Sequence, residues 1–394
     1  MHMRHTSQTL DALRLEGDPT ADTVIAGLVS SGKIDQVNQV LREFHDNDQP
    51  IPENLPPSVR AFLLATDAPP EWADTSRIAG AHDFFLDDGM HVASVLCYGA
   101  MVSCYAAMVP SRVLALTHRL DRPHRRLAET CQFVMNMMAP DPFGSGGDFV
   151  PTIQKTRLIH AAVRHFVRSS GQWDEARDGV PICQEDLLGA MLIFSVHVLD
   201  GMARLGVTVT AQEAEDYYYI WRVTGAMLGI RADIMPQSLA EARKVNALVV
   251  GRHFGASPEG IELTRGLLDF YREMTPGRTF DGVAAAMVRR VVEPWVADAL
   301  RVPQARFWTR MTAAGNRLLR SLERAEDSSA AARTVLDGAA RLLLMGGVRT
   351  LTGGQRVGLD IPSRLRDSWG VDGEHVPRPG GCPLAEPPRP ASPS

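Results

Sequence analysis

Three basic side chains share one face of a strongly apolar segment, residues 155–168 (KTRLIHAAVRHFVR). Arg157, His160 and Arg164 stand at positions i, i+3 and i+7, which places them within about 60° of one another around an α-helix. The remaining positions are mostly apolar, as in a helix that lies inside a protein. An unpaired buried charge costs on the order of several kcal/mol. The pattern therefore predicts anionic groups beside both arginines and a use for the imidazole between them.

Two interpretations of this pattern are open. In the first, a b-type heme meets the segment, because heme carries two carboxylate groups and an iron that accepts an axial imidazole. In the second, His160 is an ordinary core or surface histidine, and the arginines pair with carboxylates of the chain itself. For a lone histidine in a helix the second situation is the commoner one.

Four segments in the middle of the chain resemble one known family. They are RLAET (126–130), RLIHAAVRH (157–165), PICQEDLLGAMLIFSVHVLDGMARLG (181–206) and YYYIWRVTGAMLGI (217–230). These segments are similar to those of the latex-clearing proteins, the bacterial rubber oxygenases. Those proteins share their heme domain with a fungal oxygenase that cleaves a farnesyl side chain in mycophenolate biosynthesis. The resemblance covers roughly residues 83–236.

The resemblance implies a noncovalently bound heme b, with O₂ as co-substrate. His160 would be the proximal ligand of the iron and the metal-binding residue of the site. Arg157 and Arg164, together with His165 at the end of the motif, would be further cofactor-binding residues. A His-ligated oxygenase or oxidase acting on a hydrophobic substrate is the function that this implies.

A second cluster, which the resemblance places at the catalytic side of the porphyrin, comprises Arg126, Glu129 and Thr130. Rubber oxygenases have a lysine directly before the threonine, able to cap the iron in a closed form, whereas this chain has Glu129. A carboxylate there could bind iron weakly, relay protons, or pair with Arg126 at i, i+3. This departure puts rubber itself in doubt and favours a smaller isoprenoid or secondary-metabolite substrate.

Composition excludes several other classes of function. A net charge of −5 gives no electrostatic footprint for nucleic acid. The five cysteines contain no CxxC or CxxCH spacing, which argues against a disulfide framework, a zinc ribbon and covalent heme attachment. The chain lacks GxSxG, HExxH and dinucleotide-binding fingerprints. The first residues resemble no secretion signal and no apolar run reaches membrane length, so we expect a cytoplasmic protein without a membrane span.

Helical periodicity recurs along most of the sequence, and strand-like alternation is missing. The pattern predicts a helical pair within 18–47, a helix at 59–65, a long buried helix at 84–108 and a central one at 181–205. Gln184 and Glu185 would complement the dipole of the 181–205 helix at its first turn. His197 lies on the apolar face of that helix, as either a distal-pocket residue or a hydrogen-bonded core histidine. TAQE (210–213) matches a capping box that starts a further helix.

The sequence thus predicts an all-α protein: a single globin-like or rubber-oxygenase-like domain over residues 18–370 with a buried heme. We expect residues 1–17 to be a flexible N-terminus and the Pro-rich residues 371–394 to be disordered. The expected partners are a hydrophobic or isoprenoid small molecule and an electron donor. The alternatives are a noncatalytic heme sensor or carrier, a heme-dependent dehydrogenase or peroxidase, and a helical interaction protein without heme.

Overall fold

The computed structural model describes residues 6–117, 123–274, 282–308, 310 and 361. These residues contain helices and no β-strand, which confirms the all-α prediction. In chain order the elements are α1 (Ser7–Leu13), α2 (Pro19–Ser31), α3 (Ile34–Arg42), α4 (Pro57–Ala65), α5 (Thr75–Val95), η1 (Leu96–Ala100), α6 (Met101–Ala106), α7 (Met108–Leu116), α8 (Pro123–Met137), α9 (Phe149–Ser169), α10 (Glu175–Asp178), α11 (Gln184–Leu192), η3 (Ile193–His197), α12 (Val198–Leu205), α13 (Ala211–Met227), α14 (Leu239–His253), α15 (Pro258–Met274), α16 (Val283–Val291) and α17 (Pro294–Ala299).

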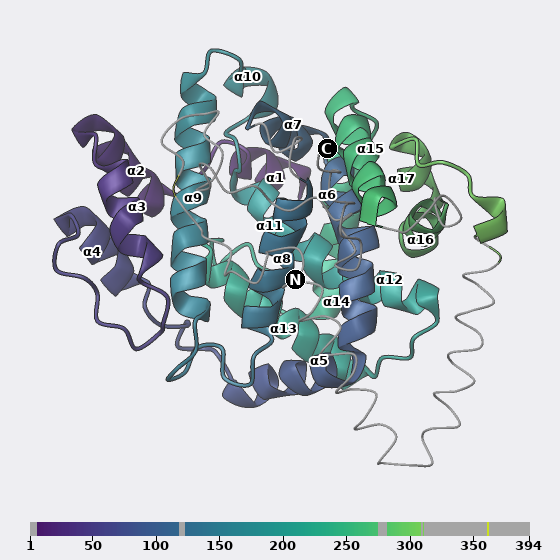
Figure 1. Cartoon of the computed structure of the whole chain (residues 1–394), viewed down its shortest axis with the longest axis horizontal. Helices are drawn as coiled ribbons and strands as arrows, with labels where there is room; N and C mark the ends of the chain where they lie inside the picture. The colour runs from purple at the N-terminus through teal and green to yellow at the C-terminus, as the bar shows by residue number, and fades with distance from the viewer. Residues whose placement is uncertain (1–5, 118–122, 275–281, 309, 311–360, 362–394) are drawn as a thin grey trace, which may run out of the picture.

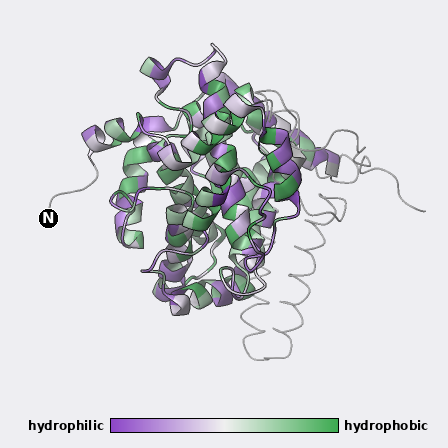
Figure 2. Cartoon of the chain, turned by 90° about the vertical axis from the view of Figure 1, so that its left-hand side faces the viewer, coloured by the Kyte–Doolittle hydropathy of each residue, from purple (hydrophilic) through white to green (hydrophobic). Residues whose placement is uncertain are grey.

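Helices α2, α3 and α4 lie on one side of the molecule, and α15, α16 and α17 lie on the opposite side (Figure 1). α13 packs along α5, and α12 also contacts α5. α2 packs on α9 and α4 packs on α2, whereas α15 lies on α6 and α7 and α16 lies on α12. Figure 2 shows hydrophobic and hydrophilic residues alternating along most helices. This is the pattern of amphipathic helices that bury one face each.

Two of the predicted helices contain a π-helical turn that periodicity did not reveal. The helix predicted at 84–108 begins earlier, at Thr75, and passes through η1, where the Met101 N–H bonds to Leu96 O five residues back. It ends at Ala106, because Ala107 adopts an extended backbone and forms an isolated antiparallel bridge with Phe254. The helix predicted at 181–205 likewise divides into α11, η3 and α12.

These two composite helices are long and apolar enough to cross a membrane. They span Thr75–Ala106 and Gln184–Leu205, and 61% and 67% of their most apolar windows are buried inside the molecule. Their buried residues belong to the main hydrophobic core. Helices at the centre of a globular core show the same length and composition, so they give only weak indication of a membrane span.

The first helix belongs to the folded core. Leu10 and Leu13 of α1 are buried in the main hydrophobic cluster. Val180 N–H bonds to Arg14 O at 2.8 Å, and Gln184 N–H bonds to Glu16 O at the same distance. The predicted flexible N-terminus of residues 1–17 is thus corrected for residues 7–16, while the predicted Pro-rich tail lies outside the described residues.

Helix α9 joins the two largest hydrophobic clusters of the described residues. Phe149, Val150 and Ile153 near its start belong to the main core. Leu158, Ala161 and Ala162 belong instead to a second cluster formed with α2, α3 and α4. The predicted helix at residues 155–168 is therefore confirmed as part of α9, and it is covered by apolar side chains on two sides.

Two ion pairs fix α9 to α2. Arg157 binds Asp18 through two guanidinium nitrogens, with 2.9 Å between Nη2 and Oδ1. Arg164, which is 1% exposed, donates from Nε to Asp22 Oδ1 at 2.8 Å and from Nη1 to Ile182 O at 2.8 Å. The anionic groups predicted beside the arginines are thus carboxylates of the chain.

We expect Arg164→Leu to lower the free energy of unfolding by about 1.5–3 kcal/mol, because it removes two charge-assisted hydrogen bonds at a buried site. Arg168→Leu on the same helix is the matched control. Its ion pair with Glu175 is about half exposed and should contribute about 0–1 kcal/mol. Urea unfolding of both variants measures the difference, and equal losses would contradict the assignment.

His197 is a hydrogen-bonded core residue. Its Nδ1 lies 3.1 Å from Ser103 Oγ and its Nε2 lies 3.0 Å from Asn246 Oδ1. These contacts suit a neutral ring that accepts from the hydroxyl and donates to the amide oxygen. Burial lowers the pKa of His197, although the bond to Asn246 and the charge of Asp200 act against this. Of the two predicted placements, the core one is confirmed.

The lowered pKa of His197 predicts a loss of stability in acid. The unfolded chain protonates this imidazole near pH 6.5, whereas the folded chain does so only at lower pH. The contribution of this group to the free energy of unfolding should therefore be fully present above pH 6.5 and decrease as the pH falls below it. The decrease is at most about 1.4 kcal/mol per pH unit. Melting curves between pH 7.5 and 5 test this, with His197→Gln as the variant that should show a shallower decline.

Candidate heme site

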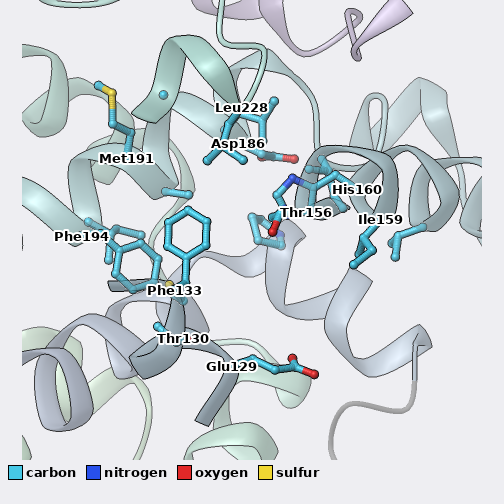
Figure 3. Close-up of a pocket in the computed structure, with 18 of the residues that line it drawn as sticks. Glu129, Thr130, Phe133, Thr156, Ile159, His160, Asp186, Met191, Phe194 and Leu228 are labelled. Atoms are coloured by element: carbon cyan, nitrogen blue, oxygen red, sulfur yellow. The ribbon is translucent and has the colours of Figure 1, made fainter. Parts of the chain in front are cut away.

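A cavity of about 650 Å³ lies between α8, α9, α11, η3 and α13. This volume is within the range of about 300–1,000 Å³ that is usual for cofactor and small-molecule sites. Figure 3 shows its residues converging from several helices that are far apart in sequence. The predicted site residues can therefore be divided into those that line this cavity and those that do not.

One side of α8 faces this cavity. Arg126, Glu129 and Thr130, which form the second predicted cluster, all line it together with Phe133. The Thr130 hydroxyl donates to Arg126 O at 2.9 Å, so the hydroxyl oxygen remains available as an acceptor. The Arg126 guanidinium lies 5.2 Å from the Tyr105 ring centre, and its Nη1 is buried without a hydrogen bond among the described residues. The predicted catalytic cluster is thus brought together.

Helix α9 contributes His160, with Thr156 and Ile159 beside it (Figure 3). The other predicted cofactor-binding residues do not line the cavity. Arg157 and Arg164 turn toward α2, and the ring of His165 packs edge-on against Phe166 at 5.3 Å. The three residues therefore lie outside the lining of this cavity. The arginines act on the site by fixing α9.

An aromatic wall, formed by Phe133, Phe194 and Trp221, lines the cavity. The Phe194 and Trp221 rings stack at 5.4 Å with an interplanar angle of 18°, and Phe133 lies 6.5 Å from Trp221 at 25°. The neighbouring tyrosines of α13 serve the core instead. Tyr217 and Tyr218 donate to backbone oxygens of Phe194 and Pro236. In the aromatic run of 217–221, tyrosines therefore belong to the core and Trp221 lines the cavity. The spacing of these residues in the sequence did not separate the two groups.

A buried polar cluster lines another part of the cavity and was not predicted. It consists of Glu185 and Asp186 at the start of α11 and His253 at the end of α14. Glu185 Oε1 lies 2.8 Å from both His253 Nε2 and Arg252 Nε. Burial acts to raise the pKa of Glu185, but these partners outweigh it and lower the pKa. The sequence predicted that Glu185 complements the helix dipole. It did not predict that Glu185 is buried or that it pairs with Arg252 and His253.

The residues present fit a heme b. An imidazole faces an apolar, aromatic-walled space, as an axial ligand must. Arg126 supplies a buried guanidinium nitrogen that can meet an anionic group, and the cations Arg42 and Lys155 also line the cavity. These are the three features that a noncovalently held porphyrin with two carboxylates requires.

Comparisons with known proteins agree with this geometry. Residues 87–325 match the family described as ER-bound oxygenase mpaB/B'/Rubber oxygenase, catalytic domain. The chain is 27% identical over 353 residues to a rubber oxygenase of Streptomyces sp. (strain K30), covering 89% of this chain and 86% of that protein. A solved structure of latex clearing protein LCP in the closed state superposes with a TM-score of 0.73 at 25% identity, covering 89% of this chain and 94% of that one. The chain therefore belongs to the mpaB and rubber oxygenase family.

Proposed function

We propose that this protein is a heme b-dependent oxygenase or oxidase that uses O₂ to oxidise a hydrophobic small molecule. One observation carries the proposal: in a chain of this oxygenase family, His160 faces an apolar cavity of cofactor size. His160 would hold the iron through one ring nitrogen. Heme iron held in this way supplies O₂ binding and activation.

The side chains around the cavity would perform three tasks. Phe133, Phe194 and Trp221 exclude water and offer flat apolar contact to the cofactor or to an alkene substrate. Arg126 presents an N–H donor, and the Thr130 oxygen can accept a hydrogen bond. Glu129 places a carboxylate at the edge of the cavity, where it could hold or release a proton.

The glutamate at position 129 favours a small substrate over a polymer. Glu129 stands where rubber oxygenases have a lysine, so lysine ligation of the iron cannot occur at this position. The lining is largely apolar, which suits an isoprenoid or a secondary metabolite with a double bond. We therefore propose a substrate of this class, with an electron donor as an additional partner.

We expect His160→Ala to lose axial iron coordination after reconstitution with hemin, because the substitution removes the imidazole that the proposal assigns to the iron. His165→Ala is the matched control on the same helix, and it should retain wild-type occupancy since His165 does not line the cavity. The Soret band and the heme-to-protein ratio of the purified proteins measure both outcomes.

Oxygen consumption with a short isoprenoid alkene distinguishes the enzyme from a carrier. A wild-type protein that shows the heme band and consumes O₂ only when the alkene is present would support the oxygenase. The band without turnover across such alkenes would favour a noncatalytic heme protein. Heme binding that is unchanged in His160→Ala would contradict the ligand assignment itself.

A further inference from the structure

A second histidine of the cavity lining, His253 at the end of α14, has one committed and one available ring nitrogen. Its side chain is 13% exposed, and its Nε2 is buried 2.8 Å from Glu185 Oε1. Its Nδ1 is accessible and makes no hydrogen bond within the residues that the structure describes. A ring nitrogen in this state can bind a polar group that enters the cavity.

Glu185 determines which nitrogen of this ring carries a proton. The Glu185 side chain is 0% exposed, and its Oε1 also accepts a hydrogen bond from Arg252 Nε at 2.8 Å. Burial acts to raise the pKa of Glu185, but the bonds from His253 and Arg252 outweigh it, so this carboxyl group is ionised. Two lone pairs would repel each other at the distance that separates Oε1 from Nε2. His253 Nε2 is therefore protonated, and Nδ1 is the nitrogen whose protonation can change.

Helix contacts hold the Glu185–His253 pair in place. Helices α11 and α14 pack closely, and a methyl group at Gly189 would lie 3.3 Å from Val249 Cγ1. Val249 stands one helical turn before His253. Val249 and Phe254 also line the cavity, so a molecule beside His253 meets apolar side chains as well as a polar nitrogen.

The charges near the pair favour a neutral partner for Nδ1. Arg14 Nη1 lies 3.7 Å from Glu185 Oε2 and 3.8 Å from Asp186 Oδ1, and Arg252 binds Glu185 from the other side. These opposite charges offset one another, so they give little compensation for the desolvation of a further ion. A hydroxyl group is uncharged. It can donate to Nδ1 of a neutral ring or accept from the Nδ1–H of a protonated ring, so it fits both states of His253.

We propose that His253 selects the substrate: its Nδ1 binds a hydroxyl group of a hydrophobic, unsaturated molecule, and Glu185 is the positioning residue of the ring. This inference rests on the proposed function, and it narrows the substrate class to unsaturated alcohols. The hydrogen bond fixes the oxygen-bearing end of the molecule at α14. The remainder of the molecule contacts the apolar lining of the cavity, which includes Val249 and Phe254.

The test compares the binding of geraniol with that of the hydrocarbon that has the same carbon skeleton and no hydroxyl. Isothermal titration calorimetry on the full chain reconstituted with hemin measures both affinities. We expect His253→Phe to reduce the ratio of alcohol affinity to hydrocarbon affinity by about threefold to tenfold, which corresponds to the loss of one neutral hydrogen bond. The affinity for the hydrocarbon should change little. His253→Leu provides a second variant if the phenylalanine form does not fold.

Glu185→Gln tests the positioning role. The glutamine amide oxygen can still accept the Nε2–H of His253, so this variant should keep most of the preference for the alcohol. A loss of the preference in Glu185→Gln as large as that in His253→Phe would overturn the assignment of Glu185 as a residue that acts through hydrogen bonding to the ring.

Two further comparisons test the site and the class of ligand. His45 also lines the cavity, and its side chain is 48% exposed, so His45→Phe is the matched control and should leave the affinity ratio unchanged. A ratio that falls in His45→Phe but not in His253→Phe would overturn the assignment to His253. Geranic acid and geranylamine carry charged groups on the same skeleton. Tighter binding of either one than of geraniol would overturn the preference for a hydroxyl.

The inference and the proposed function fail in different ways. If the wild-type protein shows the Soret band and loses it in His160→Ala, an affinity ratio that is unchanged in His253→Phe overturns this inference alone. If the wild-type protein takes up no heme, the proposed function fails. A ratio that still falls in heme-free His253→Phe would then support the alcohol site by itself.

Discussion

The charged contacts between α2 and α9 are the constraint on which the site depends. Arg157 and Arg164 are buried or nearly so, and each finds its carboxylate only while α9 keeps one rotation about its axis. Turning the helix would leave guanidiniums without partners in an apolar region, which is strongly unfavourable. In the rotation that satisfies them, His160 faces the cavity. A contact outside the site thus determines where the imidazole lies.

The sequence showed which residues share a helix face, but it did not show which other parts of the chain contact that face. Arg126, Glu129 and Thr130 were predicted to form one cluster, and all three line the cavity. The same reasoning could not identify Asp18 as the partner of Arg157, because the two lie 139 residues apart. Helical spacing is a local property, whereas such pairing depends on the tertiary fold. The second interpretation is confirmed for the arginines, which meet carboxylates of the chain, whereas His160 lines a cavity.

The aromatic wall and the buried acids show a second limit of prediction from sequence. Trp221 belongs to a run of aromatic residues that periodicity assigns to the core, and three tyrosines of that run are indeed core residues. Glu185 has the position expected of an exposed helix-start residue, yet it is buried by Arg252 and His253 of a later helix. Nothing in the residues around either position signals this. Their environment arises only when α11, α13 and α14 are assembled.

The two π-helical turns have a consequence for how the chain tolerates change in length. Each wide turn accommodates one residue more than an α-helical path would, so η1 and η3 behave as insertions within otherwise regular helices. Deleting a single residue there would restore α-helical winding and rotate everything beyond it by about 100°. Downstream of η3, the faces of α12 that pack on α5 and α16 would then be exchanged for others. Related sequences with a gap at 193–197 should consequently carry a different pattern of apolar residues along the second half of this helix.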